Sequence, residues 1–339
     1  MIVKKMPDLK GFPKSDNMKK LSENRRVNVL SAPLFYDIET TGLTQNSSFC
    51  YLIGAAVYED DNWQMYQWFA DGEEEEREIL KAFSEFMEPF TCTIQYNGNQ
   101  FDQPFLEARL KRYELPDPFA GKASLDLYQE LKPLKGLLKL SGMKQPQLEK
   151  FLKNGERRFC DGGECTRVYR KYVSSRDGNL CQIVLGHNQE DLIGLGKIFQ
   201  MISYLCLWDG EYDIVRTEFD GERLIFTLTP YSEFPVEFSN GTEDFYITGG
   251  GKQIRLAVRT TAGKVRQYYE NYRDYYYLPQ EDTIVPKSLG AYMDKSLRTP
   301  AKRETCYTWF DCTGDFLNQP EKQKQYLQHT LPYLLGTLK

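Results

Sequence analysis

Two carboxylic acids, Asp37 and Glu39, lie one residue apart in an apolar run, residues 34–39, that stops at a Thr-Thr-Gly turn. Side chains alternate along a β-strand, so both acids would share one face and Ile38 would point to the other. Carboxylates held side by side repel each other unless a cation lies between them, and oxygen ligands select Mg²⁺ or Mn²⁺. The pair predicts a divalent metal site, although on its own it is equally compatible with two solvated acids on an edge strand.

Two further acids stand at the ends of regular elements later in the chain. Asp102 begins a predicted helix directly after the strand-like run 91–96 and the turn 97–101. Asp191 follows His187 by four residues, so the two side chains would face the same way on a helix. The sequence has only two histidines. For His187 alone, an ordinary histidine at the start of a helix is the alternative interpretation.

These groups together would suit hydrolysis of a phosphodiester bond. Four carboxylates that meet at one point could hold two divalent ions about 3.5–4 Å apart, one activating a water and the other stabilising the leaving oxygen. An imidazole with an unperturbed pKa of about 6.5 could accept the proton of that water. The sequence therefore indicates a nuclease site made of acids that are far apart in the chain.

The elements that must position these acids follow an α/β order. Residues 34–39, 49–58 and 63–69 are expected to form an antiparallel meander of three strands. A helix over 73–87, a strand over 91–96 and a helix over 102–113 follow, and later helices are expected over 146–152, through 169 and 172, and over 187–207. This order is the one expected of a ribonuclease H-like fold, in which a mixed sheet is flanked by helices.

Three motifs resemble those of the DEDD 3′–5′ exonucleases. They are Asp37-Ile38-Glu39-Thr40-Thr41-Gly42, Asn97-Gly98-x-x-Phe101-Asp102 and His187-Asn188-x-x-Asp191. The stretches that connect them resemble the YprB-type branch of ribonuclease H-like domains: residues 125–127, 147–152 and 161–164. The resemblance covers roughly residues 34–207.

The resemblance implies a role for each matching residue. It makes Asp37, Glu39, Asp102 and Asp191 the ligands of two Mg²⁺ or Mn²⁺ ions, and His187 the general base. It places the following residues against the substrate: Thr40, Thr41, Gly42, Leu43, Asn97, Phe101 and Asn188. One spacing departs from the family. His-type members place the histidine five residues before the last aspartate, whereas here it stands at the four-residue spacing of the Tyr-type members. Asp126 is expected to support the site from outside or to cap a helix.

Composition places the chain among ordinary globular proteins. It has 339 residues, 41% hydrophobic and 27% charged, which is enough for about two domains. No apolar run of 18 residues and no signal peptide is seen, so a cytoplasmic protein without a membrane partner is expected. The eight cysteines include no CxxC pair, so a structural zinc site is not expected. Cys50 and Cys92, inside apolar strands, are expected to be buried thiols.

Three regions are expected along the chain: a basic N-terminal arm over 1–33, the ribonuclease H-like domain over 34–208, and a β-rich accessory domain with a C-terminal helix over 209–339. Residues 268–277 are unusually rich in tyrosine and are followed by basic residues. These tyrosines either stack the bases of a single strand or pack a small β-domain. The accessory domain could also bind a protein partner.

The sequence thus predicts a two-metal 3′–5′ exonuclease acting on single-stranded DNA or RNA. Its net charge of −5 argues only weakly against nucleic acid as a partner, because a metal site itself requires acids. Two alternatives stay open. One is a ribonuclease H-like module that binds nucleic acid or protein without cutting, and the other is a nuclease that is active only with a partner.

Overall fold

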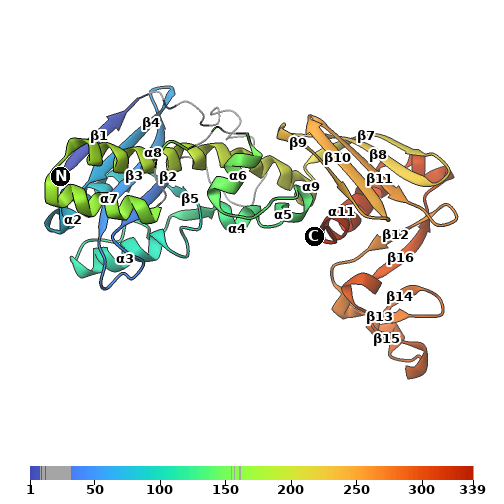
Figure 1. Cartoon of the computed structure of the whole chain (residues 1–339). Coiled ribbons are helices and arrows are strands. Elements are labelled where there is room, and N and C mark those ends of the chain that lie inside the picture. Colours follow the sequence, from blue (N-terminus) through green and yellow to red (C-terminus); the bar gives the residue numbers. More distant parts are fainter. Residues whose placement is uncertain are drawn as a thin grey trace. The chain divides into compact units, whose positions relative to one another are not determined.

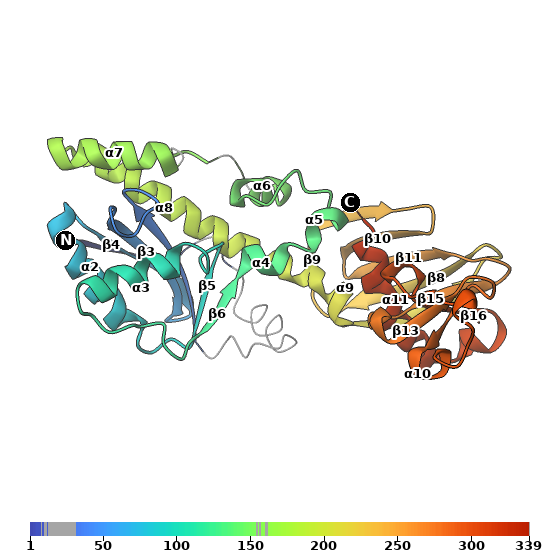
Figure 2. The ribbon, with the colours of Figure 1, turned by 90° about the horizontal axis from the view of Figure 1, so that it is seen from below.

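The computed structural model describes residues 1–7, 9, 12, 32–153, 155, 157–159 and 162–338. The chain divides into two compact units, residues 1–132 with 141–202 and residues 133–140 with 203–339. Figures 1 and 2 show the ribbon of each unit in two views. Asp161 of the predicted stretch 161–164, and most of the expected arm between residues 8 and 31, lie outside the described residues.

The first unit is built on a six-stranded mixed sheet in the order β1-β4-β3-β2-β5-β6. The pairs β1–β4, β4–β3 and β3–β2 are antiparallel, while β2, β5 and β6 run parallel to one another. Its strands are β1 (Ile2–Met6), β2 (Pro33–Thr40), β3 (Cys50–Glu59), β4 (Asn62–Phe69), β5 (Cys92–Gln95) and β6 (Ala123–Asp126). The predicted mixed sheet of a meander followed by parallel strands is confirmed.

Helices cover both faces of this sheet (Figure 2). On one face α2 (Glu76–Met87) and α3 (Asp102–Arg112) pack over the core that contains Tyr36. On the other face lie α7 (Gly162–Ser175) and α8 (Gly178–Phe199), where the ring of Phe35 packs on Phe199 at 5.7 Å. Shorter helices of the first unit are η1 (Glu73–Glu75), α4 (Leu127–Leu131) and α6 (Gln145–Phe151). Since residues alternate along β2, Asp37 and Glu39 face α8.

A buried ion pair fixes the helix that carries Asp102. The Arg109 guanidinium on α3 binds the Glu76 carboxylate on α2, and the two residues are 1% and 0% exposed. The amide of Cys50 on β3 donates to the same carboxylate at 2.8 Å. Glu76 lies in the helix predicted over 73–87. In the structure its carboxylate connects α2, α3 and β3.

Helix α8 starts at Gly178, nine residues before the helix start predicted at His187. Its N-cap is Asp177, whose side chain accepts from the amide of Asn179 at 2.9 Å. Gly186, which directly precedes the helix predicted over 187–207, lies inside α8, and a Cβ there would collide with the Phe159 ring. The glycine therefore serves packing, and His187 lies in the middle of the helix.

The start of the chain also departs from the expectation of an arm. Ile2–Met6 forms β1, which pairs with β4 along its whole length, from Ile2 opposite Phe69 to Met6 opposite Met65. The strand is short, partly exposed and contains two lysines, which is typical of a protected sheet edge. Because such a composition is also typical of a surface segment without regular structure, the sequence did not predict this strand.

The second unit is rich in strands, as predicted. A five-stranded antiparallel sheet, order β7-β8-β11-β10-β9, comprises β7 (Tyr212–Phe219), β8 (Arg223–Pro230), β9 (Phe234–Gly241), β10 (Phe245–Gly251) and β11 (Gln253–Arg259). Two small sheets contain β12 (Lys264–Tyr268), β13 (Tyr275–Leu278), β14 (Thr283–Pro286), β15 (Thr299–Pro300) and β16 (Tyr307–Asp311). The helices are α5 (Leu134–Leu137), α9 (Cys206–Asp209), α10 (Lys287–Gly290) and α11 (Pro320–Gly336).

The tyrosine-rich stretch 268–277 packs within this unit. Tyr268 stacks on Tyr333 of α11 at 3.6 Å between ring centroids. Several others surround a small core at Ile284, Ala301 and Cys306, namely Tyr269, Tyr272, Tyr275 and Tyr277. Among the described residues, no helix combines the length and the apolar character needed to cross a membrane.

Candidate metal centre

Three predicted metal ligands come together on the α8 face of the sheet. Asp37 and Glu39 project from β2 and Asp191 from α8, and one carboxylate oxygen of each lies within 4.8 Å of the other two. Glu39 is 7% exposed. Asp191 follows the other two acids by about 150 residues in the sequence, and the packing of α8 across β2 brings the three together.

Asn188 on α8 holds Asp37 in place. Its side-chain amide donates to Asp37 Oδ2 at 2.9 Å, and its Oδ1 accepts from Gln67 at 3.0 Å. Gly54 is the partner of Asp37 in the β2–β3 register, and a Cβ at this glycine would collide with the Asn188 side chain. The glycine leaves the space through which Asn188 reaches the carboxylate. Asn188 is 0% exposed and its side chain contacts Asp37 and Gln67, while its expected contact with substrate stays a prediction.

His187 lies among the same carboxylates. Its Nε2 is 3.4 Å from Glu39 Oε1 and 3.2 Å from Asp191 Oδ2, and the residue is 4% exposed. Its other nitrogen, Nδ1, is buried without a hydrogen-bond partner in the described part of the chain. The i to i+4 spacing on α8 sets the contact between His187 and Asp191. Because α8 starts at Gly178, His187 is not a histidine at a helix start.

Asp102 approaches from the other side of β2. Its Oδ1 accepts from the amide of Ile38, the residue between the two β2 acids, at 3.3 Å. It does not belong to the described group of oxygens within 4.8 Å of one another. Burial raises the pKa of Asp102 to about 7. Asp102 therefore contacts the strand segment that carries Asp37 and Glu39, but it does not join their described group of oxygens.

A bound cation would stabilise this cluster of carboxylates. Burial raises the pKa of Asp37 well above its ordinary range, and repulsion from Asp191, Asp102 and Glu39 raises it further. Glu39 has a raised pKa for the same reasons, burial first and then the charges of Asp191 and Asp102. Buried oxygen ligands that repel one another are the donor set that Mg²⁺ and Mn²⁺ prefer, so the residues present fit such ions.

An arginine that the sequence analysis missed already contacts one ligand. Arg157, between α6 and α7, binds Asp191 Oδ1 through Nη1 at 2.5 Å and Glu149 through Nη2 at 2.6 Å. Burial raises the pKa of Asp191, and the charges of His187 and Arg157 offset only part of that rise. No local pattern marks Arg157, because its partners lie on two other elements.

The predicted substrate-contacting turn is ordered by α7. Thr166 donates to the carbonyl of Thr40 at 3.3 Å and Arg170 to that of Thr41 at 3.1 Å. A Cβ at Gly42 would meet the Ser48 hydroxyl. Leu43 is 83% exposed, which leaves its apolar side chain available for contact beside the cluster.

The second motif is held by Asp126. This residue caps α4 by accepting from the amide of Tyr128 at 3.0 Å, and it also accepts from the amides of Asn97 and Asn99. Asn97 adopts a left-handed backbone with φ of 60°, which asparagine tolerates well. Phe101 precedes α3 and packs on Phe105 with ring centroids 5.7 Å apart. The expected capping role of Asp126 is confirmed, and its support of the site stays a prediction.

Comparison with known proteins gives one family. A model described as the RNase H superfamily matches residues 34–203. No curated protein matches the chain. Among solved structures, the family B DNA polymerase from the hyperthermophilic archaeon Pyrobaculum calidifontis is similar, with 11% identity, a TM-score of 0.46 and coverage of 90% of this chain. The match spans 46% of the polymerase chain.

Proposed function

Because the chain belongs to the RNase H superfamily, we propose that it is a metal-dependent nuclease that degrades single-stranded DNA or RNA from the 3′ end. The observation that carries the proposal is the convergence of Asp37, Glu39 and Asp191 within 4.8 Å. The family supports a nuclease-type function, and the cluster supports the metal requirement. The two-ion mechanism and the 3′–5′ direction rest on the resemblance of the three motifs to the DEDD exonucleases.

Each residue of the cluster has a place in the proposed reaction. Asp37, Glu39 and Asp191 would hold the ions, with Asp102 approaching from α3. Two bound divalent ions would supply a water nucleophile at neutral pH and neutralise charge on the leaving oxygen. A nitrogen of the His187 imidazole would accept the proton of that water.

The turn after β2 would receive the end of the strand. The substrate contacts proposed here are the backbone and hydroxyls of Thr40 and Thr41 and the exposed side chain of Leu43. Gly42 allows the turn to lie against Ser48. Asn97 and Phe101 would contact the substrate from the second motif. An apolar side chain beside the metal ligands can pack against the terminal base.

Degradation of labelled oligonucleotides tests this proposal. Single strands of DNA and of RNA, labelled at the 5′ end so that shortening from the 3′ end gives a ladder, are incubated with the protein and Mg²⁺ or Mn²⁺. We expect a ladder with wild type and none with Asp37→Ala or Asp191→Ala. A circular single strand should stay intact. If linear strands of both kinds also stay intact with either metal, the proposal fails.

A second candidate function is favoured by one contact. Arg157 is bound to Asp191, where its positive charge disfavours a divalent cation. A partner or substrate that draws Arg157 away would make the nuclease conditionally active. In that case wild-type protein would cut only in the presence of the partner, while Arg157→Gln would cut without it.

A further inference from the structure

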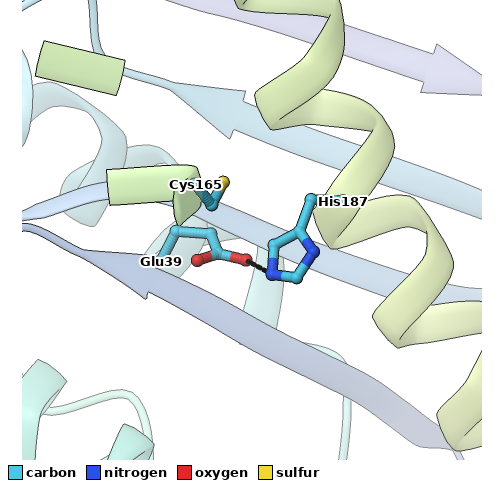
Figure 3. Close-up of side chains that lie close together, drawn as sticks. All are labelled: Glu39, Cys165 and His187. Atoms are coloured by element: carbon cyan, nitrogen blue, oxygen red, sulfur yellow. Dashed lines mark ion pairs between the residues drawn. The ribbon is translucent and has the colours of Figure 1, made fainter. Parts of the chain in front are cut away.

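A second set of ligands lies beside the carboxylates and contains sulfur. One ligand atom each of Glu39, Cys165 and His187 lies within 4.8 Å of the others, and all three residues are buried. The three come from β2, α7 and α8, and Figure 3 shows the Glu39 carboxylate directed at the His187 imidazole with Cys165 beside them. We infer that these three residues form a binding site for a single Zn²⁺ ion.

The donor atoms decide between metals. A cysteine thiolate with an imidazole selects Zn²⁺ over Mg²⁺ or Ca²⁺, which prefer oxygen ligands. Cysteine, histidine and glutamate are the usual ligands of protein zinc. The oxygen-only group of Asp37, Glu39 and Asp191 therefore differs in preference from this set, although the two share Glu39.

The spacing also suits zinc. Two ligands of a tetrahedral zinc, each about 2.0–2.1 Å from the ion, lie about 3.3 Å apart. Glu39 Oε1 and His187 Nε2 are 3.4 Å apart. Three protein ligands with a fourth position open to water are a common zinc arrangement, and Asp191, 3.2 Å from the same Nε2, stands near that position.

One further contact favours a metal at this site. The Tyr51 hydroxyl donates to Cys165 Sγ at 3.7 Å, and a donor of this kind stabilises a metal-bound thiolate. On zinc binding the thiol proton leaves to the buffer and the sulfur–zinc bond forms.

The site is invisible to sequence patterns. Zinc sites are recognised from closely spaced cysteine or histidine pairs, and Cys165 and His187 are 22 residues apart with Glu39 far upstream. The sulfur-containing set brings three elements together, whereas Asp37, Glu39 and Asp191 come from two. Because both sets use Glu39 and His187 would be a zinc ligand instead of a base, zinc should inhibit the proposed nuclease. That consequence rests on the proposed function, whereas zinc binding itself does not.

Cobalt provides a direct test, since Co²⁺ replaces Zn²⁺ and gives a sulfur-to-metal absorption band only when a thiolate is bound. The metal-free full chain is titrated with Co²⁺ and then with Zn²⁺. We expect one Co²⁺ per chain with this band, loss of the band on adding one equivalent of Zn²⁺, and no loss with excess Mg²⁺. Absence of the band at saturating Co²⁺ overturns the inference.

Two cysteine variants locate the site. Cys165→Ala should abolish the band and weaken Zn²⁺ binding on the order of 100-fold or more, beyond what the loss of an outer-shell contact costs. The matched control is Cys181→Ala, since Cys181 is buried in the same core cluster of α7 and α8 but belongs to neither ligand group. A band that survives in Cys165→Ala, or disappears in Cys181→Ala, places the metal elsewhere.

X-ray absorption at the zinc edge of the wild-type complex is independent of any variant. We expect one sulfur at about 2.3 Å together with nitrogen and oxygen ligands at about 2.0–2.1 Å. A first shell without sulfur refutes the site even if Cys165→Ala fails to fold. The nuclease assay then separates the two proposals: zinc binding without any nuclease activity refutes the proposed function and leaves this site intact.

Discussion

Asp37 owes its position to a residue without a side chain. Asn188 reaches the carboxylate across Gly54, and the amide is held from behind by Gln67. The geometry of the site therefore requires that residue 54 has no side chain. Substitution there tests whether the orientation of Asp37 matters for the metal, independently of the ligands themselves.

We predict that Gly54→Ala weakens Mn²⁺ binding by roughly 10–100-fold, the usual loss when a residue that orients a ligand is removed. The added methyl group would displace the Asn188 side chain. Isothermal titration with Mn²⁺ measures the effect. Gly178→Ala is the control, because nothing lies near a Cβ at that position. Equal affinities of the two variants would show that the contact between Asn188 and Asp37 is dispensable.

Arg157 competes with a cation for Asp191. Removal of its charge in Arg157→Gln should raise Mn²⁺ affinity roughly tenfold, the equivalent of one pKa unit of charge interaction. Arg158→Gln is a matched control, since this neighbouring side chain is exposed and its contact with Glu190 is made by its backbone amide. Mn²⁺ titration of both variants checks the prediction. A loss of affinity in Arg157→Gln would mean that the arginine supports the ligand geometry instead.

At the scale of elements, a buried ion pair connects α2 and α3. Glu76→Gln leaves the Arg109 guanidinium buried without its charge partner, which typically costs 3–5 kcal/mol. Urea unfolding should show a loss of about that size. Glu78→Gln on the same helix, where Glu78 is 58% exposed, should change stability by less than about 1 kcal/mol. Similar losses in both variants would contradict a buried ion pair.

A carboxylate also joins elements of the second unit. Partial burial raises the pKa of Asp282, but hydrogen bonds from Tyr277, Tyr307 and Trp309 outweigh this and leave the pKa below its ordinary value. A lowered folded-state pKa gives stability that is complete above the unfolded pKa of about 3.9 and is lost as the pH falls below it. The join between β13, β14 and β16 should therefore loosen in acid.

Hydrogen exchange of the β16 peptides, corrected for the intrinsic effect of pH, measures this loss. In wild type, protection of Tyr307–Asp311 should fall as the pH drops from about 5 to about 3. In Asp282→Asn the protection should be lower at pH 7 and nearly independent of pH over that range. A wild-type profile that stays flat would show that these hydrogen bonds do not stabilise the strand.

The elements that follow simple periodicity could be predicted from the sequence. Alternation placed Asp37 and Glu39 on one face, and the strand expected over 63–69 matches β4. The features that the sequence did not predict share a physical cause. Gly186 acts through contact with Phe159, and Arg157 through Glu149 and Asp191. Contacts between distant segments carry no local signal, so neither the continuity of α8 nor the ion pairs of Arg157 could be predicted.

At the scale of the whole molecule, the two units are interleaved along the chain. Residues 133–140 belong to the second unit although the first continues until 202. Within the second unit Asn240 donates to the carbonyl of Gly136 at 2.8 Å, and Leu134 and Leu137 are 0% and 1% exposed. The boundary predicted near residue 209 describes only the last of three crossings.

Truncation of the chain after residue 208 should therefore expose an apolar surface. The shortened chain retains Leu134 and Leu137 without the elements that cover them, so we expect self-association at micromolar concentration. Replacing both leucines with serine should restore a monomer in the shortened chain and destabilise the full chain. Sedimentation and thermal unfolding measure these opposite effects. A monomeric shortened chain with both leucines intact would show that 133–140 does not need its partners.

The same interleaving has a consequence during synthesis. Residues 133–140 leave the ribosome before any of the strands from 212 onward has been translated. For that interval the nascent chain carries an apolar segment whose docking site does not yet exist. The helix α11, which contacts α5, is translated after all the described strands of the second unit. The chain must keep these few residues accessible until α11 has been translated, which makes them a natural point of engagement for chaperones.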